Sequence, residues 1–304
     1  MSGAQTGIDG ILLNFSPGSL MLLNGILAIV MFSIALDLRP RDFRVFLRQP
    51  RPLLSGLFAQ FLVLPALTFL LVLVFAPQPS IALGLMLVAA CPGGNISNFI
   101  THRAGGNTAL SVSLTGFATV GAIVLTPLSI AFWGSLYTPT AEILRATRID
   151  PVQVVITVGL MLVLPLILGM VLKVHRPALA ARLRGPMQVL SMVIFVAFIV
   201  AAIAANWAYF LDYAPVVAAL VIAHNAVAMG AGNLVARGAR LSAFDRRSLT
   251  IETGIQNSGL GLVLIFGFFG GLGGMAVVAA FWGIWHAVSG IALASLWARH
   301  PVRP

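Results

Sequence analysis

The sequence is poor in charge and contains a single cysteine. Only 9% of the 304 residues are charged, whereas 59% are hydrophobic and the mean hydropathy is +1.01. A soluble domain needs more charge and less apolar surface, so the composition excludes that class and indicates an integral membrane protein. The lone Cys91 excludes an intramolecular disulfide. The ten-residue alternation of apolar and polar residues that marks a membrane β-barrel is also missing.

Long apolar runs are what the sequence has in quantity. Each run can cross about 30 Å of hydrocarbon as an α-helix, and in lipid the backbone must satisfy its own hydrogen bonds, so an all-α membrane protein is predicted. The connections are too short to hold a soluble catalytic domain, and we expect no enzyme activity. The nine predicted spans are residues 19–37, 53–75, 80–103, 107–136, 151–173, 186–205, 213–236, 244–270 and 275–298.

Basic residues follow the connections between these spans. The net charge of +10 could indicate a nucleic-acid partner, but all except two of the 18 Lys and Arg residues fall on one side of the membrane if the N-terminus is outside. The two exceptions are Arg145 and Arg148. This bias predicts an outside N-terminus and an inside C-terminus. We therefore expect contact with membrane lipid and no nucleic-acid partner.

Two of the predicted spans are interrupted by helix-breaking residues. Pro92–Gly94 falls in the middle of span 80–103, and Gly254–Gly259 falls within span 244–270. Single kinks are common in membrane helices, where polar residues also serve helix packing. Two polar breaks five spans apart, in copies of opposite orientation, are instead typical of inverted-repeat transporters whose discontinuous helices cross at the midplane.

Glu252 is the only one of the eight acidic residues that lies well inside a predicted span, about eight residues from its start. A charge at such a depth costs at least about 2.5–3.5 kcal/mol. No Lys or Arg is predicted at the same depth, which favours an exogenous cation such as Na⁺. The alternative is a protonated Glu252, which would favour a proton-coupled mechanism.

Hydroxyl and amide oxygens that suit a sodium ion occur on several of these spans. Isolated hydroxyls in membrane helices often bond only to their own backbone, and amides often bridge helices, so each residue alone is weak evidence of a site. Together they form a candidate ligand set. Its members are Gln60, Ser97, Asn98, Ser111, Thr115 and Gln256.

Four motifs identify a resemblance that covers nearly the whole chain. "CPGGNISNFITHRAGGNTALSVSLT" and "IETGIQNSGL", with "AQFLVLP" before them and "WHAVSG" after, resemble the bile acid:sodium symporter family. The resemblance implies a bacterial cytoplasmic (inner) membrane protein, expected to be a monomer, with nine spans where some relatives have ten. It implies a panel of helices at about 19–75 (its first span) and 151–205, and a core of helices at about 80–136 and 213–298.

The resemblance also implies two sodium ions and an organic anion as substrate, moved by sodium-coupled symport with alternating access. The first ion site would use the side chains of Ser97, Asn98, Ser111, Thr115 and Glu252. The second would use Gln60 and Gln256 with backbone oxygens of Glu252, Thr253 and Ile255. The anion, bile acid-like or a small carboxylate, would meet Asn95, Asn257 and His286.

Alternatives remain at this stage. Cys91 is expected to be a packing residue, but its place beside the first break also resembles arsenite exporters, in which a cysteine takes metalloid. A metalloid or proton-coupled exporter is therefore the second hypothesis. A membrane-embedded enzyme or receptor is the third, although the sequence shows no nucleophile–base pair or sensory domain for it. Two departures from the family pattern, Asn95 and Ala287, fall on the implied substrate side.

Overall fold

The computed structural model describes residues 8–10, single positions between 21 and 36, residues 50–94, 96–147, 151–205 and 207–300, and residue 302. Between 151 and 210 some side chains are not described. The described residues are organised as helices, as the sequence predicts. In order these are η1 (Ile8–Gly10), α3 (Pro50–Phe58), the π-helix η3 (Ala59–Val63), α4 (Leu64–Phe75), α5 (Pro79–Ala90), α6 (Ile96–Arg103), α7 (Thr108–Leu136), α8 (Thr138–Ala146), α9 (Pro151–His175), α10 (Pro177–Ala205), α11 (Trp207–Gly238), α12 (Ala243–Gly254), α13 (Ser258–Phe268) and α14 (Gly273–Ala298).

Each predicted span from residue 53 onward coincides with one to three of these helices, and span 53–75 is made of α3, η3 and α4. The predicted span 19–37 lies mostly outside the described residues. Helix α8, with Pro139 in its first turn, occupies a connection for which no helix was expected. Within the part of the chain that the structure describes, four stretches are long and apolar enough to cross a membrane: Pro50–Phe75, Thr108–Leu136, Leu211–Gly238 and Gly273–Ala298.

Apolar side chains cover much of the outer surface of these helices. Val74 on α4 is 77% exposed, and Leu128 and Phe132 on α7 are 54% and 56% exposed. Water would make such a surface costly, whereas lipid is as apolar as the side chains themselves. The chain is therefore an integral membrane protein.

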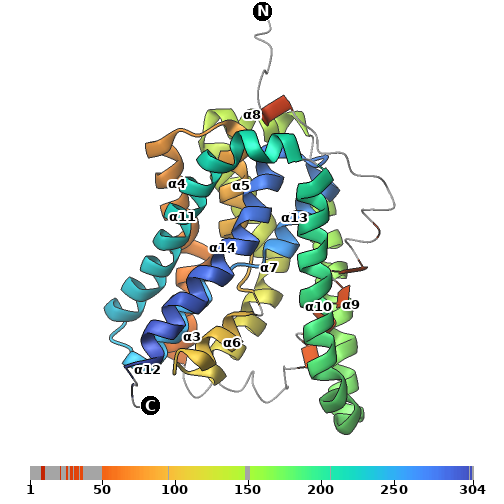
Figure 1. Cartoon of the computed structure of the whole chain (residues 1–304), viewed down its shortest axis with the longest axis vertical. Helices are drawn as coiled ribbons and strands as arrows, with labels where there is room; N and C mark the ends of the chain where they lie inside the picture. The colour runs from red at the N-terminus through yellow and green to blue at the C-terminus, as the bar shows by residue number, and fades with distance from the viewer. Residues whose placement is uncertain are drawn as a thin grey trace, which may run out of the picture.

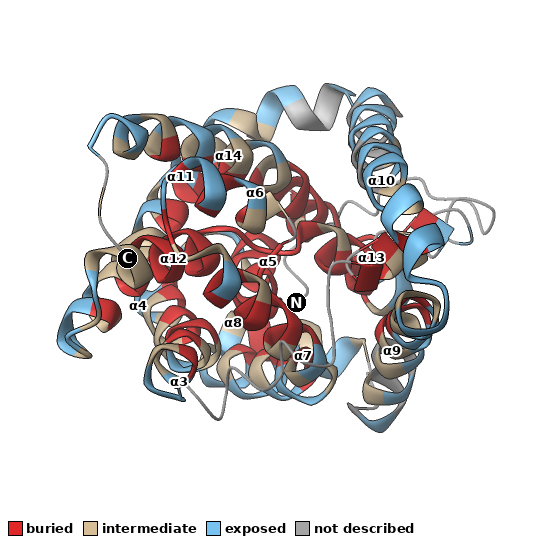
Figure 2. Ribbon diagram, turned by 90° about the horizontal axis from the view of Figure 1, so that it is seen from below, coloured by how far each residue is buried: buried red, intermediate tan, exposed pale blue. Residues whose placement is uncertain are grey.

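The helices form a bundle with one pair set to the side. Figure 1 shows α8 at one end of the molecule and α6 and α12 at the opposite end. Helices α9 and α10 pack against each other, and α9 also packs against α7. Seen along the bundle, the buried residues gather around α5, α12 and α7, while α10 is largely exposed (Figure 2). The best-buried positions therefore lie where α5 and α12 meet their neighbours.

Local sequence explains where several helices widen or begin. Pro65 has no amide hydrogen to donate to the carbonyl four residues earlier, and just before it the helix widens into η3, with the Leu64 amide bonding to the Ala59 oxygen. Asn107 caps α7 by accepting from the Leu110 amide at 3.1 Å. Ser242 caps α12 by accepting from the Asp245 amide.

Candidate ion and substrate site

The two predicted breaks are real interruptions of the helical hydrogen-bond ladder. Helix α5 ends at Ala90, and Cys91 is extended with φ −71° and ψ 154° ahead of Pro92. Helix α12 ends at Gly254, and Ile255 is extended with φ −117° and ψ 106°. Each break leaves backbone groups that no helical partner satisfies.

The extended segments at the breaks satisfy each other. The Gly94 amide donates to the Ile255 oxygen at 2.9 Å, and the Asn257 amide donates to the Pro92 oxygen at 2.8 Å. An isolated antiparallel bridge joins Gly93 to Gln256. Pairing of this kind removes the cost of burying unsatisfied backbone groups. It also holds α5, α6, α12 and α13 with their interrupted ends together.

Glycine is required where the two breaks touch. A Cβ atom at Gly93 would lie 2.5 Å from the Glu252 Oε1 atom, and one at Gly94 would lie 2.9 Å from the Gln256 backbone oxygen. Real Cβ atoms do not approach other atoms this closely, so a side chain at Gly93 would displace the Glu252 carboxylate and one at Gly94 would push the two backbone segments apart. The Gly-Gly pair after Pro92 therefore permits the close approach as well as ending the helix.

Three hydroxyl groups converge on the Glu252 carboxylate. Ser97 of α6 and Ser111 of α7 donate to Oε2 at 2.7 and 2.8 Å, and Thr115 of α7 donates to Oε1 at 2.5 Å. Asn98 lies at the edge of this cluster, with its Oδ1 atom 3.4 Å from the Thr115 oxygen. The structure thus brings together the first predicted group of ligands, from three helices.

The cluster combines one carboxylate with several oxygen atoms that carry lone pairs. Glu252 is only 4% exposed, and no ion pair joins it to a cationic side chain in the described part of the chain. The Thr115 oxygen also lies 3.0 Å from the Ser111 backbone oxygen, so oxygens outnumber the hydroxyl protons among them. Such an arrangement suits a hard cation, because a buried carboxylate needs a counter-charge.

The second predicted group is held by side-chain amides. Gln60, in the π-helical η3, donates to the Cys91 oxygen at 2.8 Å and to the Gln256 Oε1 atom at 2.7 Å. Gln256 in turn donates to the Thr253 oxygen at 2.7 Å. The carbonyls of Thr253 and Ile255 thus already accept hydrogen bonds. Reversing the two amides would turn the Gln60 oxygen toward the Cys91 carbonyl and the Gln256 oxygen toward the Thr253 carbonyl. The O and N atoms of an amide are assigned from the bonding network.

Of the three predicted substrate residues, Asn257 and His286 are described by the structure and Asn95 is not. Asn257 is 8% exposed and caps α13, accepting from the Leu260 amide at 3.0 Å, so its oxygen is engaged while its NH₂ group is available. His286 on α14 is buried, and its Nδ1 atom has no hydrogen-bond partner in the described residues. No hydrogen bond joins His286 to Asn257 there. Asn95 lies outside the described residues.

A polar chain supports the second break from behind. Asn225 of α11 donates to the Gly254 oxygen at 2.8 Å and accepts from Ser289 of α14 at 2.7 Å. The neighbouring His224 lies 2.6 Å from the Thr68 hydroxyl of α4. Both side chains therefore bridge helices. Ser289 was missed, because a lone serine in an apolar helix carries no distinctive signal.

Two further residues hold helices together in ways that the sequence did not indicate. Thr126 of α7 donates to the Ala90 oxygen at 2.6 Å, which satisfies the last carbonyl of α5. Arg247 was counted among the basic residues of a connection, but it is 7% exposed. Its guanidinium donates to the Ala104 oxygen at 2.6 Å and lies 5.5 Å from the Trp297 ring, so it fastens α12 to α6 and α14. The sequence did offer a signal for Thr126, because it directly precedes Pro127 inside a predicted span.

Comparison with known proteins decides the class of this site. A family model described as "Sodium Bile acid symporter family" matches residues 25–213, which is more than half of the chain. The chain belongs to the sodium bile acid symporter family. The family consists of transporters, which confirms the expectation that the chain is not an enzyme.

Individual relatives of this family member come from bacteria, plants and mammals. An "Uncharacterized sodium-dependent transporter YocS" of Bacillus subtilis (strain 168) is 32% identical over 273 residues, or 90% of this chain and 82% of the relative. A "Probable sodium/metabolite cotransporter BASS1, chloroplastic" of Oryza sativa subsp. japonica is 31% identical over 276 residues, or 65% of its own length. A "Sodium-dependent organic anion transporter" of Mus musculus is 32% identical over 115 residues, or 38% of this chain and 31% of the relative.

Proposed function

We propose that the protein is a sodium-coupled symporter that carries an organic anion across the membrane by alternating access. The observation that carries the proposal is the Glu252 carboxylate, buried among three hydroxyls where two interrupted helices meet, with no cationic partner in the described residues. A sodium ion supplies the missing charge. The sodium dependence named in its relatives supports the same coupling.

Two sodium ions are proposed. The first is bound by the side chains of Ser97, Asn98, Ser111, Thr115 and Glu252. The second is bound by Gln60 and Gln256 with backbone oxygens of Glu252, Thr253 and Ile255, after both amides reverse. Gln256 follows Glu252 by four residues, across the end of α12, so the two ions would share one segment of chain.

The proposed architecture is an inverted repeat with nine membrane spans. The breaks of α5–α6 and α12–α13 would then lie at the membrane midplane, where half-helix N-termini attract anions and freed carbonyls attract cations. Helices α9 and α10, set to the side of the bundle, would belong to a panel that moves against the rest. Helices α3 and α4 fall within residues 19–75, which the family resemblance places in the panel, but they are proposed to move with the core, because Gln60 bonds to both breaks.

The substrate is proposed to be an organic anion, either bile acid-like or a small carboxylate. The mouse relative is named as an organic anion transporter, which supports a negatively charged substrate and leaves the size of the substrate open. With the N-terminus outside, two sodium ions and one monovalent anion would carry one net positive charge inward. That charge is worth about 2.3 kcal/mol per 100 mV of membrane potential.

Uptake into proteoliposomes tests the proposal. We expect radiolabelled taurocholate or pyruvate to accumulate only with an inward sodium gradient, and more strongly with the lumen negative. Glu252→Gln should abolish this dependence, because the neutral amide removes the charge that binds sodium. Glu142→Gln, on the exposed surface of α8, is the matched control. Accumulation that ignores sodium, or that survives in Glu252→Gln, would contradict the proposal.

The metalloid alternative has less support. The Cys91 thiol is fully buried, close to the Cβ position of Gly261. Within the described residues no group of three His, Cys, Asp or Glu side chains could hold a metal. We expect Cys91→Ser to leave sodium-driven uptake intact, whereas loss of metalloid resistance in that variant would favour an exporter.

A further inference from the structure

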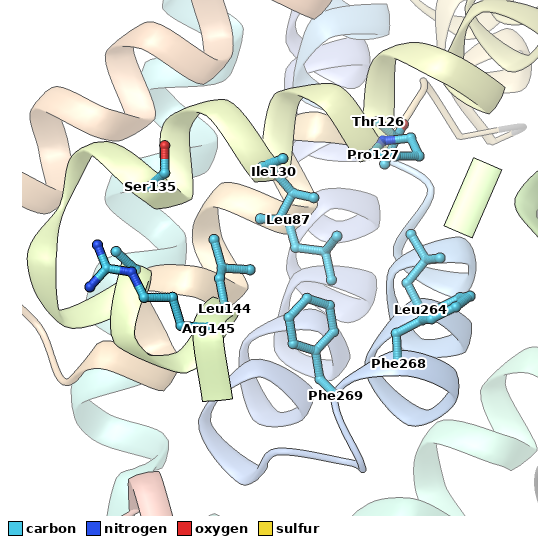
Figure 3. Close-up of a pocket in the computed structure, with 12 residues that line it drawn as sticks. Leu87, Thr126, Pro127, Ile130, Ser135, Leu144, Arg145, Leu264, Phe268 and Phe269 are labelled. Carbon is cyan, nitrogen blue, oxygen red and sulfur yellow. The ribbon is translucent and has the colours of Figure 1, made fainter. Parts of the chain in front are cut away.

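A cavity of about 230 Å³ lies among α5, α7, α8 and α13, apart from the Glu252 cluster. Most of its wall is apolar and aromatic. Figure 3 shows Leu264 and Phe268 at one end, Phe269, Leu87 and Ile130 in the middle, and Ser135 and Arg145 at the other end. The cavity therefore has an apolar end and a polar end.

Among the described residues, Arg145 is the only charged side chain that lines the cavity. The other two polar lining groups are already engaged, because Thr126 donates to the Ala90 oxygen and Ser135 donates to the Phe132 oxygen. Arg145 is exposed, and no ion pair joins it to an acidic side chain within the described ranges. Glu142 stands one turn earlier on α8 and does not line the cavity. The guanidinium is thus available to an anion at this end.

We propose that this cavity binds an amphipathic organic monoanion, with its carboxylate on Arg145 and its ring or alkyl body against Leu264 and Phe269. A guanidinium matches a carboxylate with two parallel hydrogen bonds. Aromatic and aliphatic walls bury the apolar body. The volume falls just below the usual range for small-molecule pockets, about 300–1,000 Å³, which limits the occupant to a compact molecule.

The cavity is connected to the candidate ion site through the end of α5. Leu87 lines the cavity one turn before Cys91, whose oxygen accepts from Gln60. Thr126 lines the cavity and holds the Ala90 oxygen. A molecule in the cavity therefore packs against the same helix end that Gln60 holds on its other side. We identify the occupant of the cavity with the transported anion, and this identification rests on the proposed function. Binding to the cavity can be measured without transport.

Binding of 2-naphthoate to the full chain in phosphatidylcholine nanodiscs tests the proposal, with empty nanodiscs as background and equilibrium dialysis as the readout. We expect saturable binding that weakens at least tenfold in Arg145→Gln, because the carboxylate loses its partner. Arg176→Gln, a basic residue on the connection from α9 to α10 and remote from the cavity, should stay within twofold. The neutral 2-naphthamide should bind weakly, and equally, to the unaltered protein and to Arg145→Gln.

A second pair of variants fills space instead of removing charge. Ala131→Phe places a ring in the cavity from an exposed lining position and should abolish binding. Val124→Phe, two turns earlier on α7 and also exposed, should not change it. Absence of saturable binding, equal binding by Arg145→Gln and the unaltered protein, or full binding by Ala131→Phe would overturn the proposal. Displacement of 2-naphthoate by phosphatidylglycerol in the nanodisc would also overturn it, because a lipid headgroup would then be the occupant.

The two proposals fail separately. If uptake depends on sodium but Arg145→Gln binds 2-naphthoate as well as the unaltered protein does, only the proposal for the cavity is overturned. If Arg145→Gln weakens 2-naphthoate binding but uptake does not depend on sodium, only the proposed function is overturned. Binding of 2-naphthoate without sodium should survive in Glu252→Gln, because the carboxylate lies outside the cavity.

Discussion

Gly93 and Glu252 are in such close contact that a single methyl group on Gly93 would lie 2.5 Å from the carboxylate oxygen Oε1. The backbone of the first break therefore lies directly against the side chain at the second. This contact explains why the acidic residue and the glycines are needed together. It also makes the geometry of the cluster sensitive to the smallest possible substitution.

Gly93→Ala should destabilise the protein by about 1–3 kcal/mol, because the new methyl group overpacks a rigid contact. It should also weaken sodium binding by displacing Glu252 from its hydroxyl partners. Thermal unfolding with and without sodium measures both effects. Gly267→Ala on α13 is the matched control, since nothing lies within 4 Å of its Cβ position. A helical Gly→Ala change without a clash should stabilise by about 0.5–1 kcal/mol, so an equal loss in both variants would contradict the contact.

Thr115→Val tests the shortest hydrogen bond to Glu252. The substitution removes a hydroxyl oxygen that is proposed to bind the first sodium ion, so we expect sodium affinity to fall at least tenfold, or about 1.4 kcal/mol. Thr119→Val, one turn later, removes a hydroxyl that bonds only to the Thr115 backbone oxygen. Sodium titration of thermal stability should show a shift in Thr115→Val alone, and matching shifts would remove Thr115 from the proposed ligand set.

Sequence alone located the two breaks and the groups at them. Pro92 and the glycines end helices for steric reasons that act locally, and Glu252 stands out because it is a lone acid in an apolar span. The structure confirms that Ser111 and Thr115 reach Glu252, which their spacing of one helical turn made possible. Their role as sodium ligands stays a prediction.

Other features depend on tertiary contacts that no local pattern encodes. Gln60 could have faced any neighbour, and only the fold shows that it joins Cys91 to Gln256. The sequence did not show that the Asn257 oxygen caps α13, and the role of Asn257 toward substrate stays a prediction. Arg247 was treated as a topology signal, since a charge count cannot distinguish an exposed guanidinium from one buried against carbonyls.

The chain from Ser289 through Asn225 to the Gly254 oxygen should behave as one unit. Asn225→Ala leaves the Gly254 carbonyl unsatisfied in a buried site, which should cost about 1–3 kcal/mol. Ser289→Ala should cost less in the Asn225→Ala background than in the unaltered protein, with a coupling energy of about 0.5–3 kcal/mol. A double-mutant cycle by chemical unfolding in detergent measures this energy, and strictly additive losses would show that the two contacts are independent.

The number of sodium ions is tested through Gln60, which belongs only to the second proposed site. With two coupled ions, sodium-dependent uptake should rise with a Hill coefficient above one, up to the number of sites. Gln60→Leu should lower the coefficient to about 1 while the Glu252 cluster still binds its ion. Gln78→Leu, at an exposed position with no side-chain cap bond, is the matched control. A coefficient near one in the unaltered protein would leave a single ion at Glu252, and the paired amides of Gln60 and Gln256 would then be a structural link between the two breaks.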